Sequence, residues 1–106
     1  MFIHFVRFAT PLPHEEVRRL FEERAPRYRE VPGLLQKYYG YEPSSGVFCG
    51  CYIFDSEESR QAFRQSELAR TISAVYQVDE TRVEGYEVFF PHYEVPQLST
   101  DQVQHI

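Results

Sequence analysis

The chain has 106 residues, of which 42% are hydrophobic and 25% are charged, a composition that indicates one globular domain. Its net charge of −5 disfavours nucleic acid as a partner, because an acidic surface repels phosphate backbones. No run approaches the roughly 18 apolar residues of a membrane span, and the first residues lack the features of a signal peptide. We therefore expect a cytoplasmic protein that binds neither nucleic acid nor membrane.

The first part of the chain predicts a strand and a helix. Residues 2–8 form the strand, and Pro13 fits the first turn of the helix that follows. The apolar positions of this helix recur at helical spacing: Val17, Leu20, Phe21, Ala25 and Tyr28. Pro26 is expected to kink or interrupt the helix near residues 22–25, and residues 31–33 end it.

A hairpin, two short helices and a last strand are predicted next. Residues 34–42 and 47–54 form antiparallel strands around a turn sequence of hairpin length. Ser56 fits a helix N-cap, and the apolar stripe slips in phase near Gln65-Ser66, which predicts a helix, a break and a second short helix. The fourth strand is expected over residues 81–90.

The element order β-α-β-β-α-β predicts a ferredoxin-like α+β domain over residues 1–90, with helices on one face of a four-stranded antiparallel sheet. The strands are apolar on both faces, so the helix-free face needs a second cover. A homodimer that packs sheet face against sheet face supplies it and forms a dimeric α+β barrel. Residues 91–106 are a polar tail, which we expect to cross to the partner subunit as a dimer arm.

Polar groups on apolar strands are the candidate catalytic residues, since no strong catalytic motif is present. His4 is either a satisfied core histidine or a general base. Arg7 either pairs with Glu84 or Glu87 on the neighbouring strand, or orients an anionic oxygen.

Tyrosines are the candidate substrate-binding residues: Tyr39, Tyr52 and Tyr86 suit a pocket for an aromatic ligand, although a dimer core would use the same side chains. Alternation places Tyr39 with Tyr41 on one face of the second strand and Tyr38 on the other. Cys49 and Cys51 are interpreted as small core residues, because two thiols with His4 make a poor zinc site and a disulfide between them is improbable. We expect no metal site.

Two runs resemble a known family. Residues 31–39 (VPGLLQKYY) are similar to the entry into the second strand of the dimeric α+β barrel superfamily, and residues 50–59 (GCYIFDSEES) to its third strand and helix cap. Within that superfamily the chain resembles the YdhR-like monooxygenases, which are relatives of the antibiotic-biosynthesis monooxygenases. The resemblance spans residues 1–90 in element order.

The resemblance implies a homodimer with a pocket between sheet and helices in each subunit. It also implies oxidation of a small aromatic or polycyclic phenol-like compound with O₂, without metal, flavin or other cofactor. In that activity His4 is the implied base, Arg7 the anion partner, and Tyr39 and Tyr52 orient the ring. Trp is absent from the chain, which disfavours haem breakdown, because haem-degrading relatives use a set that includes Trp.

Two other functions compete with this one. The first is a non-catalytic dimeric binding protein for a small hydrophobic metabolite. The second is a structural module whose aromatic side chains only fill the dimer. A pocket of ligand size that contains His4 or Arg7 favours the monooxygenase and the binding protein over the structural module.

Overall fold

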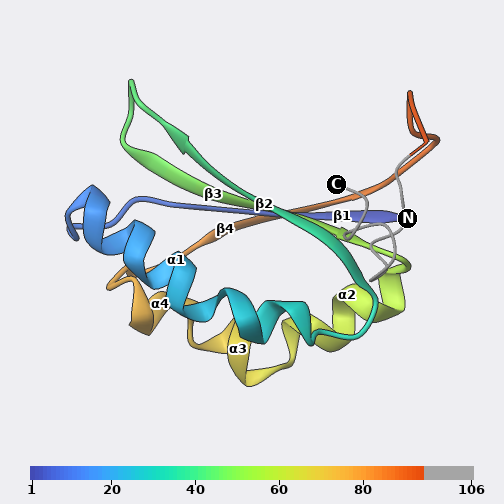
Figure 1. The fold of residues 1–106 in the computed structure, drawn as a ribbon, viewed down its shortest axis with the longest axis horizontal. Helices are drawn as coiled ribbons and strands as arrows, with labels where there is room; N and C mark the ends of the chain where they lie inside the picture. The colour runs from blue at the N-terminus through green and yellow to red at the C-terminus, as the bar shows by residue number, and fades with distance from the viewer. Residues whose placement is uncertain (95–106) are drawn as a thin grey trace.

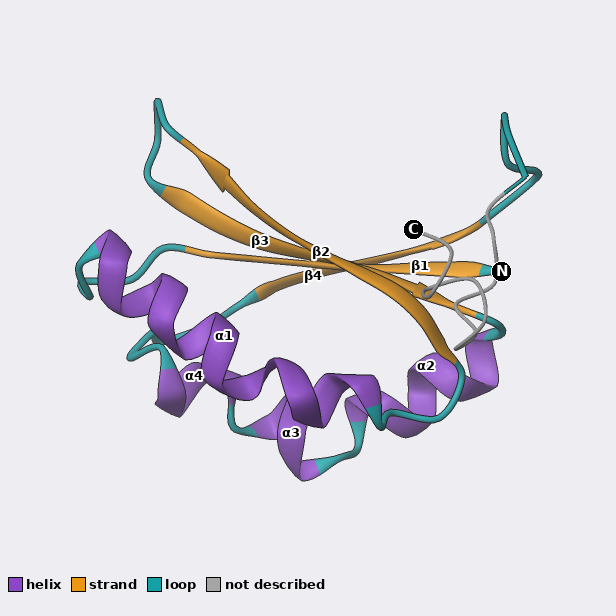
Figure 2. Cartoon of the chain, viewed as in Figure 1, coloured by secondary structure: helices purple, strands orange, loops and turns teal. Residues whose placement is uncertain are grey.

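Residues 1–94, the part of the chain that this computed structural model describes, form four strands and four helices. In chain order they are β1 (Phe2–Phe8), α1 (His14–Arg29), β2 (Leu34–Glu42), β3 (Val47–Phe54), α2 (Glu57–Arg64), α3 (Glu67–Arg70), α4 (Ile72–Val75) and β4 (Arg82–Glu87). All pairs of neighbouring strands are antiparallel, in the order β2-β3-β1-β4. All four helices lie on one side of the sheet (Figures 1 and 2), which confirms the ferredoxin-like α+β fold.

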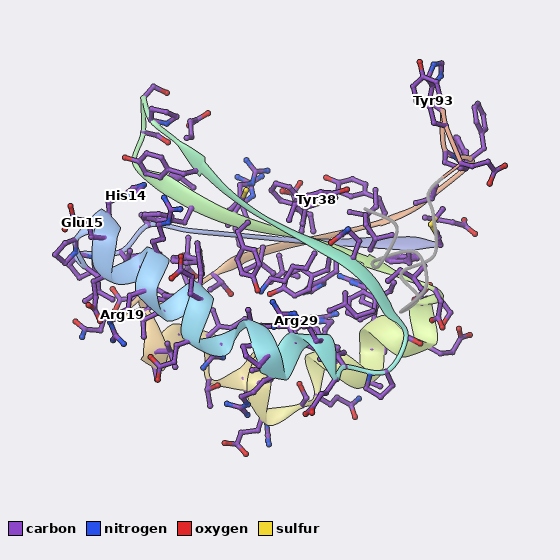
Figure 3. All side chains as sticks on the ribbon, viewed as in Figure 1. His14, Glu15, Arg19, Arg29, Tyr38 and Tyr93 are labelled. Carbon is purple, nitrogen blue, oxygen red and sulfur yellow. The ribbon has the colours of Figure 1, made fainter. Side chains whose placement is uncertain are left out.

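The two faces of the sheet differ in cover, as the apolar alternation predicts. On β3, Phe48, Tyr52 and Phe54 are buried beneath the helices. Cys49, Cys51 and Ile53 alternate with them and are only half-buried. Tyr38 projects from the side of the sheet opposite the helices (Figure 3) and is 59% exposed. In the single chain, the helix-free face therefore exposes apolar side chains to solvent.

Helix α1 is not interrupted at its proline and ends just before residues 31–33, as predicted. Pro13 is the N-cap, and its carbonyl accepts hydrogen bonds from the amides of Glu16 and Val17. The helix continues through Pro26 to Arg29, so the predicted interruption is wrong. Proline removes a single backbone hydrogen bond, and Tyr28, the next-to-last residue of the helix, is buried in the core, which stabilises the last turn.

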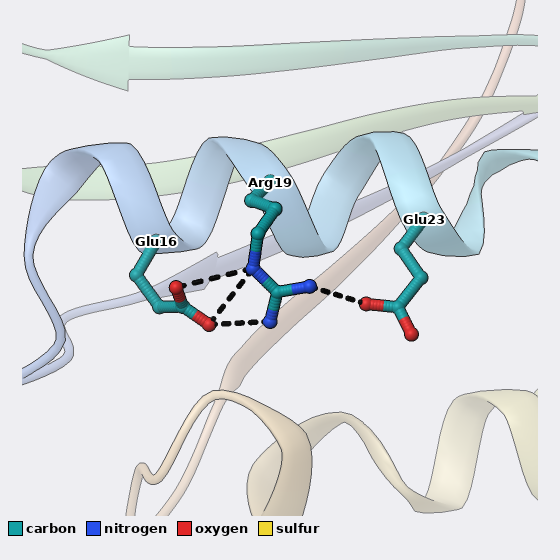
Figure 4. A network of polar contacts seen from close by, with 3 residues as sticks. All are labelled: Glu16, Arg19 and Glu23. Atoms are coloured by element: carbon teal, nitrogen blue, oxygen red, sulfur yellow. Dashed lines mark hydrogen bonds and ion pairs between the residues drawn. The ribbon is translucent and has the colours of Figure 1, made fainter.

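The outer surface of α1 carries an ion-pair network (Figure 4). Arg19 Nη2 lies 2.5 Å from Oε1 of Glu16, and Arg19 Nη1 lies 2.9 Å from Oε2 of Glu23. All three side chains are exposed, and pairs of this kind contribute little to stability because water already solvates the charges. This network therefore contributes little to the stability of the helix.

Serines begin the helices that follow β3. Ser56 accepts a hydrogen bond from the amide of Ser59 at 3.1 Å, which confirms it as the N-cap of α2. Ser66 accepts one from the amide of Ala69 at 3.2 Å and begins α3 after the predicted break. The predicted second short helix consists of two single turns, α3 and α4, that meet at Thr71.

Beyond β4 the chain leaves the sheet. This strand ends at Glu87 instead of residue 90, and the segment after it extends away from the sheet with Tyr93 near its far end (Figures 1 and 3). Phe89, Phe90 and Tyr93 are each more than three-quarters exposed. Most of the predicted dimer arm, residues 95–106, lies outside the described residues. Across residues 1–94, no helix is long and apolar enough to cross a membrane.

Candidate functional site

The sheet divides the predicted site residues between its two faces. His4, Tyr39 and Tyr52 lie on the face that the helices cover, whereas Arg7 and Tyr86 lie on the open face. His4 and Arg7 are three residues apart on one strand, and an odd spacing turns their side chains in opposite directions. Within one chain, a small molecule bound at either face therefore contacts one of these two groups and not both.

His4 is a buried histidine that accepts a hydrogen bond from an arginine. Arg60 Nε donates a 2.9 Å hydrogen bond to His4 Nδ1, which leaves the proton of the neutral imidazole on Nε2. The ring packs edge-on against Tyr52 and Phe63 at centroid distances of 5.1 and 5.7 Å. Burial and the nearby charge of Arg60 lower the pKa of His4 to about 4. At neutral pH His4 is uncharged and is a weak base.

Arg7 forms an ion pair with Glu84 on β4, as one of its two predicted roles requires. Tyr86 donates a 2.5 Å hydrogen bond to the other oxygen of the same carboxylate. These two hydrogen bonds, from Tyr86 and from Arg7, lower the pKa of Glu84. The three side chains line a broad concavity of about 1160 Å³ on the open face, together with Phe5 and Cys49.

An aromatic groove opens between α1 and the edge strand β2. Its volume is about 360 Å³, which is the size of a small-molecule site. The lining is mostly aromatic: Tyr41 lies 4.6 Å from His14 and 4.8 Å from Phe48, and Tyr39 lies 4.8 Å from Phe21, as distances between ring centroids. His14, which lines the groove, lies at the start of α1, where Figure 3 labels it. The groove therefore fits a planar apolar ligand.

Lys37 lies behind the groove, among three tyrosine rings. Its Nζ is 3.3 Å from the ring centroid of Tyr28, 4.2 Å from that of Tyr39 and 4.5 Å from that of Tyr52. Among residues 1–94, no carboxylate forms an ion pair with it. Burial, with a smaller contribution from the charge of Arg24, lowers the pKa of Lys37 to about 6.

Arg24 is a buried cation on the same side of the sheet. Its guanidinium donates a 3.0 Å hydrogen bond to the carbonyl of Leu68 and lies 6.0 Å from the ring centroid of Tyr76. Arg24 Nε is buried without a hydrogen-bond partner in the described part of the chain. The Arg24 guanidinium, beside a lysine amine and without a described carboxylate, makes this part of the interior favourable for an anion.

The cysteines do not assemble a metal site with His4. Cys49 and Cys51 are free thiols on the open face, and His4 lies on the other face. Burial raises the pKa of Cys51, which keeps that thiol protonated. Within the described ranges, no group of three or more His, Cys, Asp or Glu side chains is placed to hold a metal ion.

Sequence reasoning missed Lys37, although a signal was present. Lys37 shares the alternation of Tyr39 and Tyr41, so its side chain belongs on the helix-covered face. It is also the single lysine among the 106 residues. A lone cation on the apolar face of a strand is uncommon, because burying an ammonium group is costly.

Several solved structures have the same fold. A putative antibiotic biosynthesis monooxygenase from Deinococcus radiodurans is 17% identical and has a TM-score of 0.71, over 91% of this chain and 100% of that one. SnoaB, a cofactor-independent oxygenase from Streptomyces nogalater, is 16% identical with a TM-score of 0.68, over 88% and 98%. A dimeric ferredoxin-like protein of unknown function from Thermobifida fusca is 13% identical with a TM-score of 0.64, over 83% and 92%. At these identities the similarity shows the fold alone.

Family membership rests on the sequence. No curated protein sequence matches the chain. Residues 3–96, which include nearly all of the helices and strands, match the family described as "Putative mono-oxygenase ydhR". The chain therefore belongs to the ydhR mono-oxygenase family.

Proposed function

We propose that this protein is a cofactor-independent monooxygenase that oxidises a small aromatic or polycyclic phenol-like compound with O₂. The observation that carries the proposal is the aromatic groove between α1 and β2, which has the volume and lining of a site for a planar ligand. Membership of the ydhR mono-oxygenase family supports it. So does the fold shared with SnoaB, which is described as a cofactor-independent oxygenase.

The chemistry follows from ionisation of the substrate. Loss of the hydroxyl proton makes a phenol electron-rich, and the phenolate can itself reduce O₂. A ring C–H and the O–H of the phenol are consumed: one oxygen atom becomes the second carbonyl of a quinone, and the other leaves as water. The substrate supplies all the electrons, so the protein has to bind the ring, accept the proton and exclude water.

Tyr39 and Tyr52 are proposed to contact the ring from the helix-covered side of the sheet. Tyr39 lines the groove and is partly exposed, whereas Tyr52 is buried behind it. His4 stays a candidate for a polar contact on this side. Arg7 and Tyr86 stay candidates only for a substrate bound at the open face, because the sheet separates them from the groove.

Two chains are proposed to form a homodimer through their open sheet faces, which closes a dimeric α+β barrel. The open face carries Tyr38 and Tyr86, which are 59% and 51% exposed, and a broad concavity beside them. An apolar surface of this kind on a small domain is typical of an interface. A protein of the same fold from Thermobifida fusca is described as dimeric. The segment after β4 is proposed to contribute Phe89, Phe90 and Tyr93 to the same interface.

Oxygen uptake tests the proposed activity. The purified protein is mixed with naphthols and anthrones, and O₂ consumption and quinone formation are measured with and without added metal chelator. We expect uptake of one O₂ per quinone formed. Binding of these compounds without O₂ consumption would instead support the non-catalytic binding protein.

Variants on the two faces locate the substrate. Tyr39→Ala alters the groove, whereas Arg7→Ala alters the open face, and the sheet lies between them. We expect Tyr39→Ala to lower turnover and Arg7→Ala to leave it nearly unchanged. The reverse pattern would move the substrate to the open face. Unchanged turnover in Tyr39→Ala, Arg7→Ala and His4→Ala alike would exclude both proposed surfaces.

A further inference from the structure

We propose that Lys37, as a neutral amine, is the general base that takes the hydroxyl proton of a phenolic substrate bound beside Tyr39, and that the ammonium group so formed then holds the phenolate oxygen. The inference deepens the proposed function and rests on it for the later reaction with O₂. The ionisation itself needs no O₂, so it can be tested separately.

The surroundings of Lys37 allow both protonation states. Burial favours the neutral amine, and no described carboxylate compensates an ammonium group at this position. Three ring faces within 4.5 Å reduce the cost of the charge, because an ammonium group is attracted to the face of an aromatic ring. A general base must gain a proton and lose it again in each cycle. Around Lys37, the ring faces lower the free energy of the ammonium group and burial favours its return to the neutral amine.

The charges around Lys37 favour an anionic product. The titratable and charged groups around it come from five elements or their ends: His4, Arg24, Tyr28, Tyr39, Cys49, Tyr52 and Tyr76. None of them is a carboxylate. Burial raises the pKa of Tyr39 and Tyr52, and His4 is uncharged at neutral pH, so none of these three carries a competing charge. A phenolate would therefore meet the Lys37 ammonium with Arg24 as a second positive charge nearby.

The aromatic groove and the space beside Lys37 share part of their lining. A small cavity of about 20 Å³ lies beside the lysine between sheet and helices, with room for about one water-sized group. Phe21 and Tyr39 line both this cavity and the larger groove. Tyr39 is 37% exposed and belongs to an edge strand, which leaves its side chain room to rotate, and the proposal requires such a rotation to join the two spaces. The substrate ring then occupies the groove, and its hydroxyl group reaches Nζ.

The proposed step is a single proton transfer. The O–H bond of the phenol breaks and an N–H bond forms at Nζ, so a neutral pair becomes a phenolate and an ammonium ion. No electron moves in this step. In later steps the ammonium group returns its proton to a reduced oxygen atom that leaves as water.

The single lysine makes a direct measurement simple. In protein made with isotope-labelled lysine, the labelled side-chain NMR signal is that of Lys37 alone. We expect this signal to titrate near pH 6, and addition of naphthol at neutral pH under anaerobic conditions to shift it toward the ammonium position. A titration at the ordinary lysine value, with no response to naphthol, would overturn the inference.

The ionised fraction of bound naphthol gives a second readout, from its absorbance without O₂. Lys37→Met keeps the length of the side chain and removes the base, and Arg70→Met, at an exposed position on α3, is the matched control. We expect the ionised fraction to fall by about tenfold or more in Lys37→Met, which corresponds to one pKa unit or more, and to stay unchanged in Arg70→Met. Equal ionisation in all three proteins would overturn the inference.

The two proposals fail in different ways. Ionised naphthol in the wild-type protein without any O₂ consumption would retain Lys37 as the base and remove the monooxygenase. O₂ consumption by Lys37→Met with the rate and pH profile of the wild type would retain the monooxygenase and remove Lys37 as its base.

Discussion

Arg60 and His4 form a buried hydrogen-bonded pair in which a guanidinium group of α2 holds an imidazole of β1 at 2.9 Å. The pair depends on Gly85 of β4, which lies opposite His4 in the strand register. A Cβ atom at Gly85 would come within 2.5 Å of Arg60 Cζ, so glycine leaves the space that the guanidinium group occupies. Figure 2 shows α2 beneath the strands, as this contact requires.

Gly85→Ala is therefore expected to displace Arg60 from His4. Burial is the larger cause of the low pKa of His4 and remains in the variant, whereas the charge of Arg60 is the second cause. Displacement of Arg60 should therefore raise the pKa from about 4 part of the way toward the ordinary value of 6.5. An NMR titration of the His4 imidazole measures this shift. Gly46→Ala, at a turn with open space around the Cβ position, is the control and should leave the His4 titration unchanged.

Lys37→Met is expected to stabilise the fold, with an effect that depends on pH. In the wild type, Lys37 has a pKa of about 6 when folded and an ordinary value of 10.5 when unfolded, so between these values the unfolded chain binds more protons. Wild-type stability should therefore rise with pH across this window. The gain from methionine should be full at and below about pH 6, on the order of a few kcal/mol, and should shrink as the pH rises toward 10.

Denaturant unfolding at several pH values measures this effect, with Arg70→Met as the exposed control. A constant difference between Lys37→Met and the wild type at every pH would show that Lys37 titrates normally in the folded protein. A stabilising Lys37→Met that also loses naphthol ionisation would indicate that the lysine is kept at a cost in stability for its chemistry.

Gly33→Ala is expected to destabilise the protein more than Gly46→Ala. Both glycines have positive φ, 79° and 77°, which costs about 1 kcal/mol or more for alanine. At Gly33 the added Cβ would also lie 2.5 Å from Ser59 Cβ, whereas at Gly46 it would meet open space. We expect a loss of about 3 kcal/mol for Gly33→Ala and about 1 kcal/mol for Gly46→Ala in thermal or denaturant unfolding. Equal losses of stability in the two variants would mean that α2 shifts to make room for the added atom.

Tyr38→Asp is expected to dissociate the proposed homodimer. Tyr38 projects from the open face of the sheet (Figure 3), and a carboxylate there would be desolvated against the partner subunit. Analytical ultracentrifugation should show a shift from dimer to monomer, while circular dichroism stays unchanged. Arg70→Glu, on the helix-covered side, should remain dimeric. A Tyr38→Asp variant that dimerises as the wild type does would place the interface elsewhere.

The residue pattern alone predicted the strands well. Residues 2–8, 34–42 and 47–54 match β1, β2 and β3, because apolar and β-branched or aromatic runs between turn sequences have few alternatives. The alternation also placed Tyr39 and Tyr41 on one face and Tyr38 on the other. The interruption predicted at Pro26 was wrong, since a local rule about hydrogen bonds cannot weigh the burial of Tyr28 two residues later.

In the candidate site, the sequence determines some features and the tertiary structure determines others. Local periodicity determined the elements, their order and the face on which each side chain lies, because a strand alternates whatever it packs against. Periodicity carries no information about which groups meet across strands and helices. Only the packed structure brought Arg60 of α2 to His4 and left Lys37 among Tyr28, Tyr39 and Tyr52 without a described carboxylate. Burial and charge then set the pKa of each group, and these moved the candidate base from His4 to Lys37.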